Sequence, residues 1–92
     1  MKFEWDKNKA ESNRKKHGVE FSEASTVFAD PLEITINDPL HSISEYRFLS
    51  IGKSKQGQLL VVSYTEHQAN NIRIISARLA TKHEKKHYEH NN

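Results

Sequence analysis

The chain has 92 residues, 35% of them hydrophobic and 28% charged, which is typical of one small globular domain over residues 1–92. It contains no cysteine, which excludes disulfides and thiolate zinc sites. No apolar run approaches the ~20 residues of a membrane span, and residues 1–6 lack the apolar core of a signal peptide. We therefore expect a cytoplasmic protein without membrane contact. Its formal net charge of +2 permits RNA binding without requiring it.

The first elements are expected to be a short strand and a polar helix. Residues 3–5 alternate between apolar and polar side chains, as an edge strand does. Asp6 is a good N-cap for a helix over residues 7–17, and Gly18 supplies the left-handed residue that ends it. Ala10 is the only hydrophobic residue of this helix, so we expect the helix to be mostly exposed or to face a ligand or partner.

A second helix is predicted to begin around Phe21, with Ser22 as its N-cap. Its core-facing stripe has the helical spacing i, i+3, i+4 and consists of Ala24, Val27 and Phe28. The helix is expected to end at Asp30, because the residue before a proline avoids the helical region.

Four strand-like segments follow, with polar turns between them. They cover residues 33–37, 45–51, 59–64 and 72–78. Short connections make neighbouring strands antiparallel. A last helix opens at Thr81, which can form a capping box with Glu84. The predicted fold is an α+β domain of order β-α-α-β-β-β-β-α, with an antiparallel sheet and its helices packed on one face.

Three of the four arginines lie in predicted strands: Arg47, Arg73 and Arg78. Strict alternation places Arg73 on the face of Ile75 and Ala77, and Arg78 on the other face. A guanidinium in a strand needs a carboxylate, a rim position or a phosphate, since burial without a partner is costly. These side chains therefore form structural ion pairs or bind an RNA backbone, where they would stabilise a phosphorane.

Two segments that contain histidine are further candidates. Lys16 and His17 end the polar helix, where the helix dipole stabilises cations; alternatively, His17 acts as general acid or base. Residues 83–87 match the pattern H-E-x-x-H, in which Glu84 would be the general base of a zinc hydrolase. Such a site needs a dry, shaped pocket, whereas this helix is polar. We therefore expect no metal site and assign Glu84 to the capping box.

The order and spacing of several short motifs resemble the BrnT toxin family over nearly the whole chain. The motifs are Phe3-Glu4-Trp5-Asp6, Asn13, Lys16-His17-Gly18-Val19-x-Phe21, Phe28-x-Asp30-Pro31, Glu45-x-Arg47-x-x-x-Ile51-Gly52, Arg73-Ile74-Ile75-Ser76-Ala77-Arg78 and Thr81-x-x-Glu84-x-x-x-Tyr88. Each motif is weak alone, and together they are specific.

The resemblance implies a RelE-like fold and an endoribonuclease that needs no metal or cofactor. It also implies a BrnA-type ribbon-helix-helix antitoxin that neutralises the toxin, with operator DNA contacted only through the toxin–antitoxin complex. The site residues that it implies are Lys16, His17, Glu45, Arg47, Arg73 and Arg78. We expect the antitoxin to cover the arginine-bearing surface or the polar first helix.

RNA carries its own nucleophile, the 2′-hydroxyl, so the enzyme must align the attack, stabilise the phosphorane and move protons. We assign phosphate and transition-state binding to Arg47 and Arg73, with Lys16 as an RNA contact. Arg78 would bind phosphate or anchor the sheet, and His17 or Glu45 would be the general base or acid. The alternatives are a non-catalytic module that binds RNA or the antitoxin, and a metal hydrolase.

Overall fold

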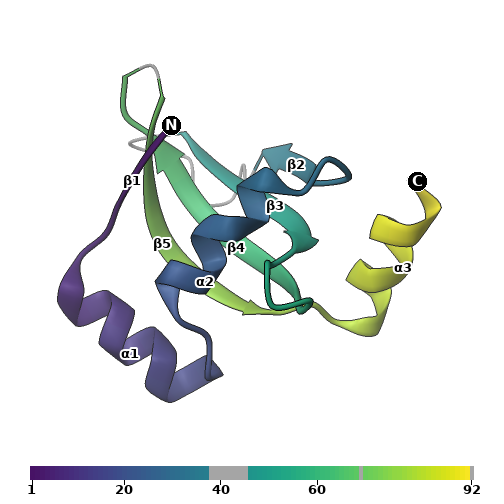
Figure 1. The fold of residues 1–92 in the computed structure, drawn as a ribbon, viewed down its shortest axis with the longest axis horizontal. Coiled ribbons are helices and arrows are strands. Elements are labelled where there is room, and N and C mark those ends of the chain that lie inside the picture. Colours follow the sequence, from purple (N-terminus) through teal and green to yellow (C-terminus); the bar gives the residue numbers. More distant parts are fainter. Residues whose placement is uncertain (38–45, 69, 92) are drawn as a thin grey trace.

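The computed structural model describes residues 1–37, 46–68 and 70–91, and its architecture is a five-stranded sheet with helices around it (Figure 1). The elements are β1 (Lys2–Glu4), α1 (Lys7–His17), α2 (Phe21–Ser25), η1 (Thr26–Ala29), β2 (Ile34–Asn37), β3 (Arg47–Lys53), β4 (Leu59–Glu66), β5 (Asn71–Leu79) and α3 (Lys82–His90). The strand order is β1-β5-β4-β3-β2. The predicted α+β class and element order are confirmed. The sheet is mixed, because β1 pairs with β5 in parallel and the other pairs are antiparallel.

The main core lies between the sheet and the α2–η1 segment, on what we call the α2 face. Buried residues of the segment pack against buried residues of β4 and β5: Phe21, Ala24 and Val27 against Leu60, Val62, Tyr64, Ile72, Ile74 and Ala77. The predicted apolar stripe is therefore confirmed. The N-cap position is Glu20 and not Ser22, since the helix already begins at Phe21, whose side chain is needed in the core.

The opposite side of the sheet, which we call the α3 face, carries a smaller apolar cluster that α3 covers. Tyr88 of α3 packs against Ile51 and Val61. Its hydroxyl donates a 2.8 Å hydrogen bond to Asp30 Oδ2, which ties the end of α3 to the η1–β2 connection. The expectation that all helices pack on one face is therefore wrong for α3. The physical reason is that this second face has apolar residues of its own that must leave water.

A β-bulge in β5 decides which way its arginines point. Ser63 pairs with Ser76 while Tyr64 pairs with Ile74, so Ile75 is an extra residue between the two pairs. An inserted residue reverses the alternation beyond it. The side chains of Arg73 and Arg78 consequently share the α3 face, and the expectation from strict alternation that they lie on opposite faces is wrong.

Asn13 is the only buried residue of α1, and it attaches the helix to β5. Its side-chain oxygen accepts the backbone N–H of Ala77 at 3.0 Å, and its Nδ2 donates to the Ala77 carbonyl at 2.8 Å. Nδ2 also donates to the carbonyl of Val19 at 3.1 Å. The amide thus continues the pairing of the β5 edge beyond the three residues that β1 occupies. The prediction of a mostly exposed first helix is confirmed.

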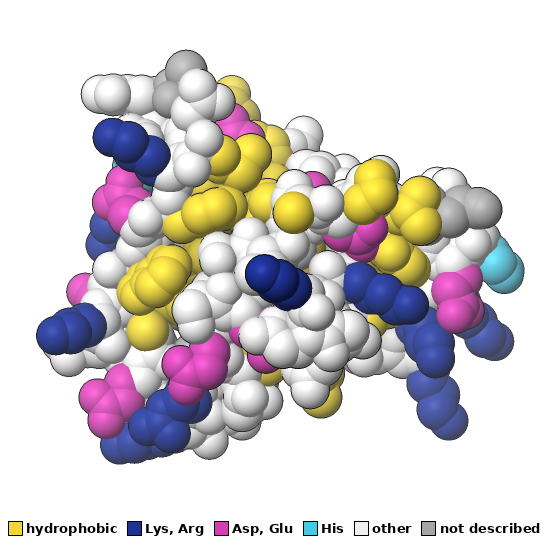
Figure 2. All heavy atoms as spheres, viewed as in Figure 1, with side chains coloured by type: hydrophobic (Ala, Val, Ile, Leu, Met, Phe, Trp, Pro, Cys, Tyr) yellow, Lys and Arg dark blue, Asp and Glu magenta, His cyan; other side chains and the backbone are white. Residues whose placement is uncertain are grey.

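The surface in Figure 2 separates apolar from charged regions. Hydrophobic side chains gather along the middle of this face, whereas Lys and Arg side chains gather toward the ends, over α1 at the lower left and α3 at the right. Among the described residues, no helix has both the length and the apolar character needed to cross a membrane.

Replacing Asn13 with alanine is expected to lower the free energy of unfolding by about 2–3 kcal/mol. The change leaves the backbone groups of Ala77 and the Val19 carbonyl without their buried partner, and each such group costs about 1–3 kcal/mol if water does not replace it. Denaturant unfolding measures the effect. Asn8→Ala, at an exposed position of the same helix, is the control, with a change within about 0.5 kcal/mol; equal losses in both variants would refute the role of the Asn13 amide.

Candidate active site

Four side chains form a row across the α3 face of the sheet, from β1 to β3. The register aligns Glu4 with Arg73, Arg73 with Thr65, and Thr65 with Arg47. Residues directly opposite one another on neighbouring strands project to the same face. The tertiary structure therefore brings together Arg47 and Arg73, which the sequence placed in separate strands.

The two guanidinium groups of this row have different surroundings. Arg73 forms an ion pair with Glu4, with 3.0 Å between Nη1 and Oε2, yet 41% of its side chain remains exposed. The Nε atom of Arg47 is buried, as is the hydroxyl of Thr65 beside it. A guanidinium has five donor hydrogens, so the one hydrogen bond that Arg73 makes with a described residue, Glu4, leaves it with donors for a further anion.

A surface hollow of about 390 Å³, which we call the arginine hollow, is lined by both arginines. It is lined by Glu4, Lys9, Arg47, His67, Gln68, Asn71, Arg73 and Ile75. Its described lining has three cationic side chains and one carboxylate, which favours an anionic ligand. A phosphodiester that entered it would meet donors able to stabilise developing negative charge.

Sequence reasoning missed three titratable residues of the arginine hollow, Glu4, Lys9 and His67, together with Gln68, Asn71 and Ile75. Glu4 reaches it because β1 pairs with β5, which no local pattern announces. His67 lies in the β4–β5 turn, where its backbone N–H donates to the Asn71 carbonyl at 2.9 Å. For His67, the one signal in the sequence was the residue type. A histidine in a turn next to arginine-bearing strands is a candidate for proton transfer.

A second hollow of about 330 Å³, the α1 hollow, adjoins the first. It is lined by Asn8, Lys9, Ser12, Asn13, Lys16, His17, Ile75 and Ser76. Lys9 and Ile75 line both hollows, so the two are adjacent on the surface. The predicted site residues Lys16 and His17 thus lie beside the arginine pair, in the neighbouring hollow. Glu45, the remaining acid–base candidate, lies outside the described residues.

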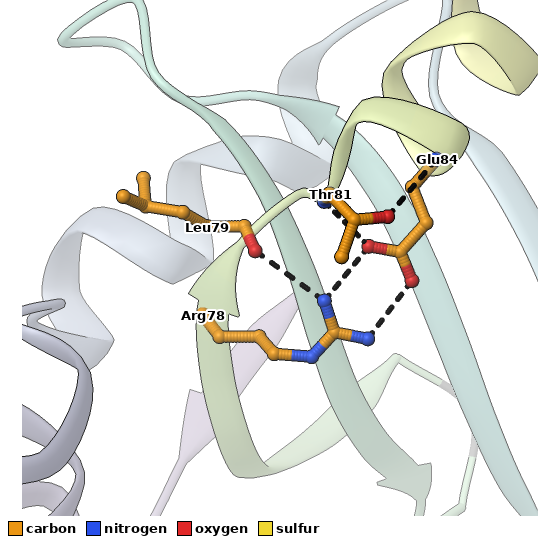
Figure 3. Close-up of polar contacts among 4 residues, drawn as sticks. All are labelled: Arg78, Leu79, Thr81 and Glu84. Atoms are coloured by element: carbon orange, nitrogen blue, oxygen red, sulfur yellow. Dashed lines mark hydrogen bonds and ion pairs between the residues drawn. The ribbon is translucent and has the colours of Figure 1, made fainter.

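Arg78 stands apart from both hollows and is held by Glu84 of α3 (Figure 3). Its Nη1 and Nη2 donate to the two carboxylate oxygens at 2.7 and 2.9 Å, and Nη1 also lies 3.3 Å from the Leu79 carbonyl. Thr81 completes the arrangement, because its backbone N–H donates to the same carboxylate at 2.8 Å. Of the two roles that the sequence left open for Arg78, this geometry favours anchoring.

The same contacts bear on the H-E-x-x-H pattern. Hydrogen bonds from Arg78 lower the pKa of Glu84 to about 2, and the Thr81 cap acts in the same direction. The capping box is confirmed, with both of its reciprocal hydrogen bonds present. A carboxylate with so low a pKa and both oxygens engaged is a poor general base. Within the described part of the chain, no three His, Cys, Asp or Glu side chains are grouped as metal ligands.

Two of the three comparisons with known proteins found a match. The family model described as "Ribonuclease toxin, BrnT, of type II toxin-antitoxin system" matches residues 5–84. Among solved structures, the crystal structure of the Brucella abortus ribonuclease toxin BrnT superposes with a TM-score of 0.65 at 23% sequence identity. The match covers 89% of this chain and 99% of that one, and it shows that the fold is shared. The comparison with curated proteins gives no match.

Glu84→Gln is expected to flatten the acid dependence of stability. The folded pKa of Glu84 is about 2 against an ordinary value of 4.5, so the unfolded chain takes up the proton first. The stabilisation is complete above about pH 4.5 and is lost as the pH falls toward 2. We expect the variant to lose about 1 kcal/mol at pH 7 and to differ less from the wild type at pH 2.5.

Urea unfolding at a series of pH values measures this difference. Glu89→Gln, an exposed position on the same helix, is the control and should follow the wild-type curve. A Glu84→Gln curve parallel to that of the wild type between pH 4.5 and 2.5 would contradict the role given to the Arg78 contact.

Proposed function

Because the chain belongs to the BrnT family of ribonuclease toxins of type II toxin–antitoxin systems, we propose that it is an endoribonuclease that cleaves RNA without a metal ion or cofactor. The observation that supports this most directly is the Arg47–Thr65–Arg73 row, which puts two arginine side chains on one face, where both line one hollow. Fixed cations of this kind replace the charge that a metal ion would otherwise supply to a phosphorane.

The proposed reaction is attack of the 2′-hydroxyl of RNA on the adjacent phosphorus. Arg47 and Arg73 bind the phosphate and stabilise the additional negative charge of the transition state. The P–O5′ bond breaks, which gives a 2′,3′-cyclic phosphate end and a 5′-hydroxyl end. One group removes the 2′-hydroxyl proton and another protonates the leaving oxygen.

The proton-transfer roles fall to titratable side chains of the chain. The family resemblance offers His17 and Glu45, and the geometry adds His67, which lines this hollow with Arg47 and Arg73. Arg78 has a structural role in this proposal: its ion pair with Glu84 holds α3 against the sheet.

Arg47→Ala and Arg73→Ala are each expected to reduce RNA cleavage by about 10²–10³-fold, because each removes a preorganised donor to the transition state. Arg73→Lys should recover only part of the rate, since an ammonium group cannot bind phosphate through two parallel bonds. The measurement is cleavage of a labelled RNA with the product ends mapped, and wild-type activity should survive EDTA.

Arg14→Ala is the matched control, since Arg14 pairs with Glu20 at 3.7 Å and lines neither hollow. Circular dichroism establishes that each variant is folded. Full activity in both arginine variants would overturn the assignment. RNA binding by the wild type without any cleavage would instead favour the non-catalytic binding module, and loss of activity in EDTA would favour a metal hydrolase.

We further propose that a BrnA-type ribbon-helix-helix antitoxin is the partner and that it covers the arginine hollow with acidic side chains. Operator DNA would then be bound by the antitoxin within the complex. Support comes from the cationic lining of the hollow, which suits an acidic partner segment as well as RNA.

Expression of the chain alone in bacteria is expected to arrest growth, and co-expression of the neighbouring antitoxin gene should restore it. Binding of the purified antitoxin should weaken when Arg47 or Arg73 is replaced, and also at high salt, because salt screens interactions between exposed charges. Isothermal titration at two salt concentrations measures this. An affinity that stays the same after replacement of Arg47 or Arg73 and at high salt would place the antitoxin on another surface.

A further inference from the structure

We propose that the α1 hollow is a binding subsite for single-stranded RNA, which holds a nucleotide that flanks the scissile phosphate. This inference rests on the proposed ribonuclease activity and extends it. It specifies single-stranded RNA as the substrate class. Lys9 would contact the strand between the two hollows, and Lys16 would contact the next phosphate along the strand.

The first argument is continuity. The α1 hollow and the arginine hollow are adjacent and share Lys9 and Ile75, so a strand with its phosphate at Arg47 and Arg73 would pass these two side chains to reach the α1 hollow. Its volume of about 330 Å³ is in the range of pockets that take small ligands. A hollow of this size suits one splayed nucleotide, as in single-strand recognition, and not the regular face of a duplex.

The second argument is the distribution of charge on α1. Two of its cations are engaged by carboxylates on the exposed surface: Arg14 with Glu20 and Lys15 with Glu11, at 3.7 and 3.6 Å. Lys9 and Lys16 line the α1 hollow, and neither has an ion pair with a described carboxylate. Both lysines that line the hollow are therefore available for a phosphate backbone, as is Lys7, which does not line it.

The third argument is how the sequence places these lysines. Lys9, Ser12, Asn13 and Lys16 have the spacing i, i+3, i+4, i+7, so they share one face of α1. Asn13 fixes this face to β5 through both backbone groups of Ala77. The two lysines stand on either side of that anchor, about 10 Å apart along the axis at 1.5 Å per residue. Their flexible stems allow the two ammonium groups to reach phosphates of one extended strand.

The remaining lining supplies groups suited to a nucleoside. Asn8, Ser12 and Ser76 offer donors and acceptors for a base edge or a 2′-hydroxyl. Ile75, which the bulge places between the two hollows, offers an apolar contact for a base. An acidic segment of a protein partner would find the same cations but would not require these uncharged groups.

The test compares neighbouring lysines of α1. Lys16→Gln is expected to weaken binding of a single-stranded, 2′-O-methylated RNA hexanucleotide about 5–10-fold, and to reduce the slope of log affinity against log salt by about 0.7, the value for one phosphate contact. Lys15→Gln removes the same charge at a position that is paired with Glu11, and it should behave as the wild type. For a cleavable RNA, Lys16→Gln should raise KM with little change in kcat.

A second variant tests occupancy without a change of charge. Ser12→Leu projects into the α1 hollow from an exposed helix position and is expected to weaken hexanucleotide binding while the salt slope stays unchanged. A duplex of the same sequence should bind more weakly than the single strand.

The inference is overturned if Lys16→Gln binds and cleaves RNA as the wild type does, if Lys15→Gln shows the same loss, or if Lys16→Gln and Ser12→Leu weaken only the binding of the antitoxin. These outcomes are distinct from failure of the proposed function, in which the wild-type protein itself would cleave no RNA. Full wild-type cleavage with unaffected variants removes the subsite and leaves the ribonuclease assignment intact.

Discussion

The arrangement of the site depends on one buried contact, the pairing of the Asn13 amide with both backbone groups of Ala77. A helix with almost no apolar residues has little hydrophobic surface to hold it against a sheet. The Asn13 amide supplies the attachment instead. It forms the hydrogen bonds that a neighbouring strand would make to β5 at Ala77, beyond the end of β1. Because the attachment is polar and specific, the cations of α1 are placed beside the strand arginines in a fixed orientation.

The bulge at Ile75 determines where the arginines of β5 point, and their surroundings give them different roles. It turns Arg73 and Arg78 to the same face, but they lie at opposite ends of β5, so their surroundings differ. Arg73 keeps much of its side chain in solvent at the edge of a cationic hollow, whereas both Nη atoms of Arg78 bind Glu84. The same residue type thus serves anion binding at one end of the strand and the attachment of α3 at the other.

The different roles of the arginines show which parts of the candidate site can be predicted from the sequence. Strand arginines were identifiable as candidates because guanidinium groups are unusual among apolar strand residues. The sequence did not show that two of them line one hollow while the third forms a structural ion pair. That outcome depends on a bulge and on which carboxylate the fold places beside each arginine. Glu4 and Glu84 reach Arg73 and Arg78 from opposite ends of the chain.

The sequence alone determined the α+β class, the order of the elements, the capping box at Thr81 and the polar character of α1, because periodicity and capping are local properties. Only the tertiary structure decided that β1 pairs in parallel with β5, that α3 covers the second face, and that Lys9 and His67 join the arginine pair. These features depend on backbone pairing and burial between distant segments. No local pattern records such contacts, because each depends on which distant strand or helix the fold brings alongside.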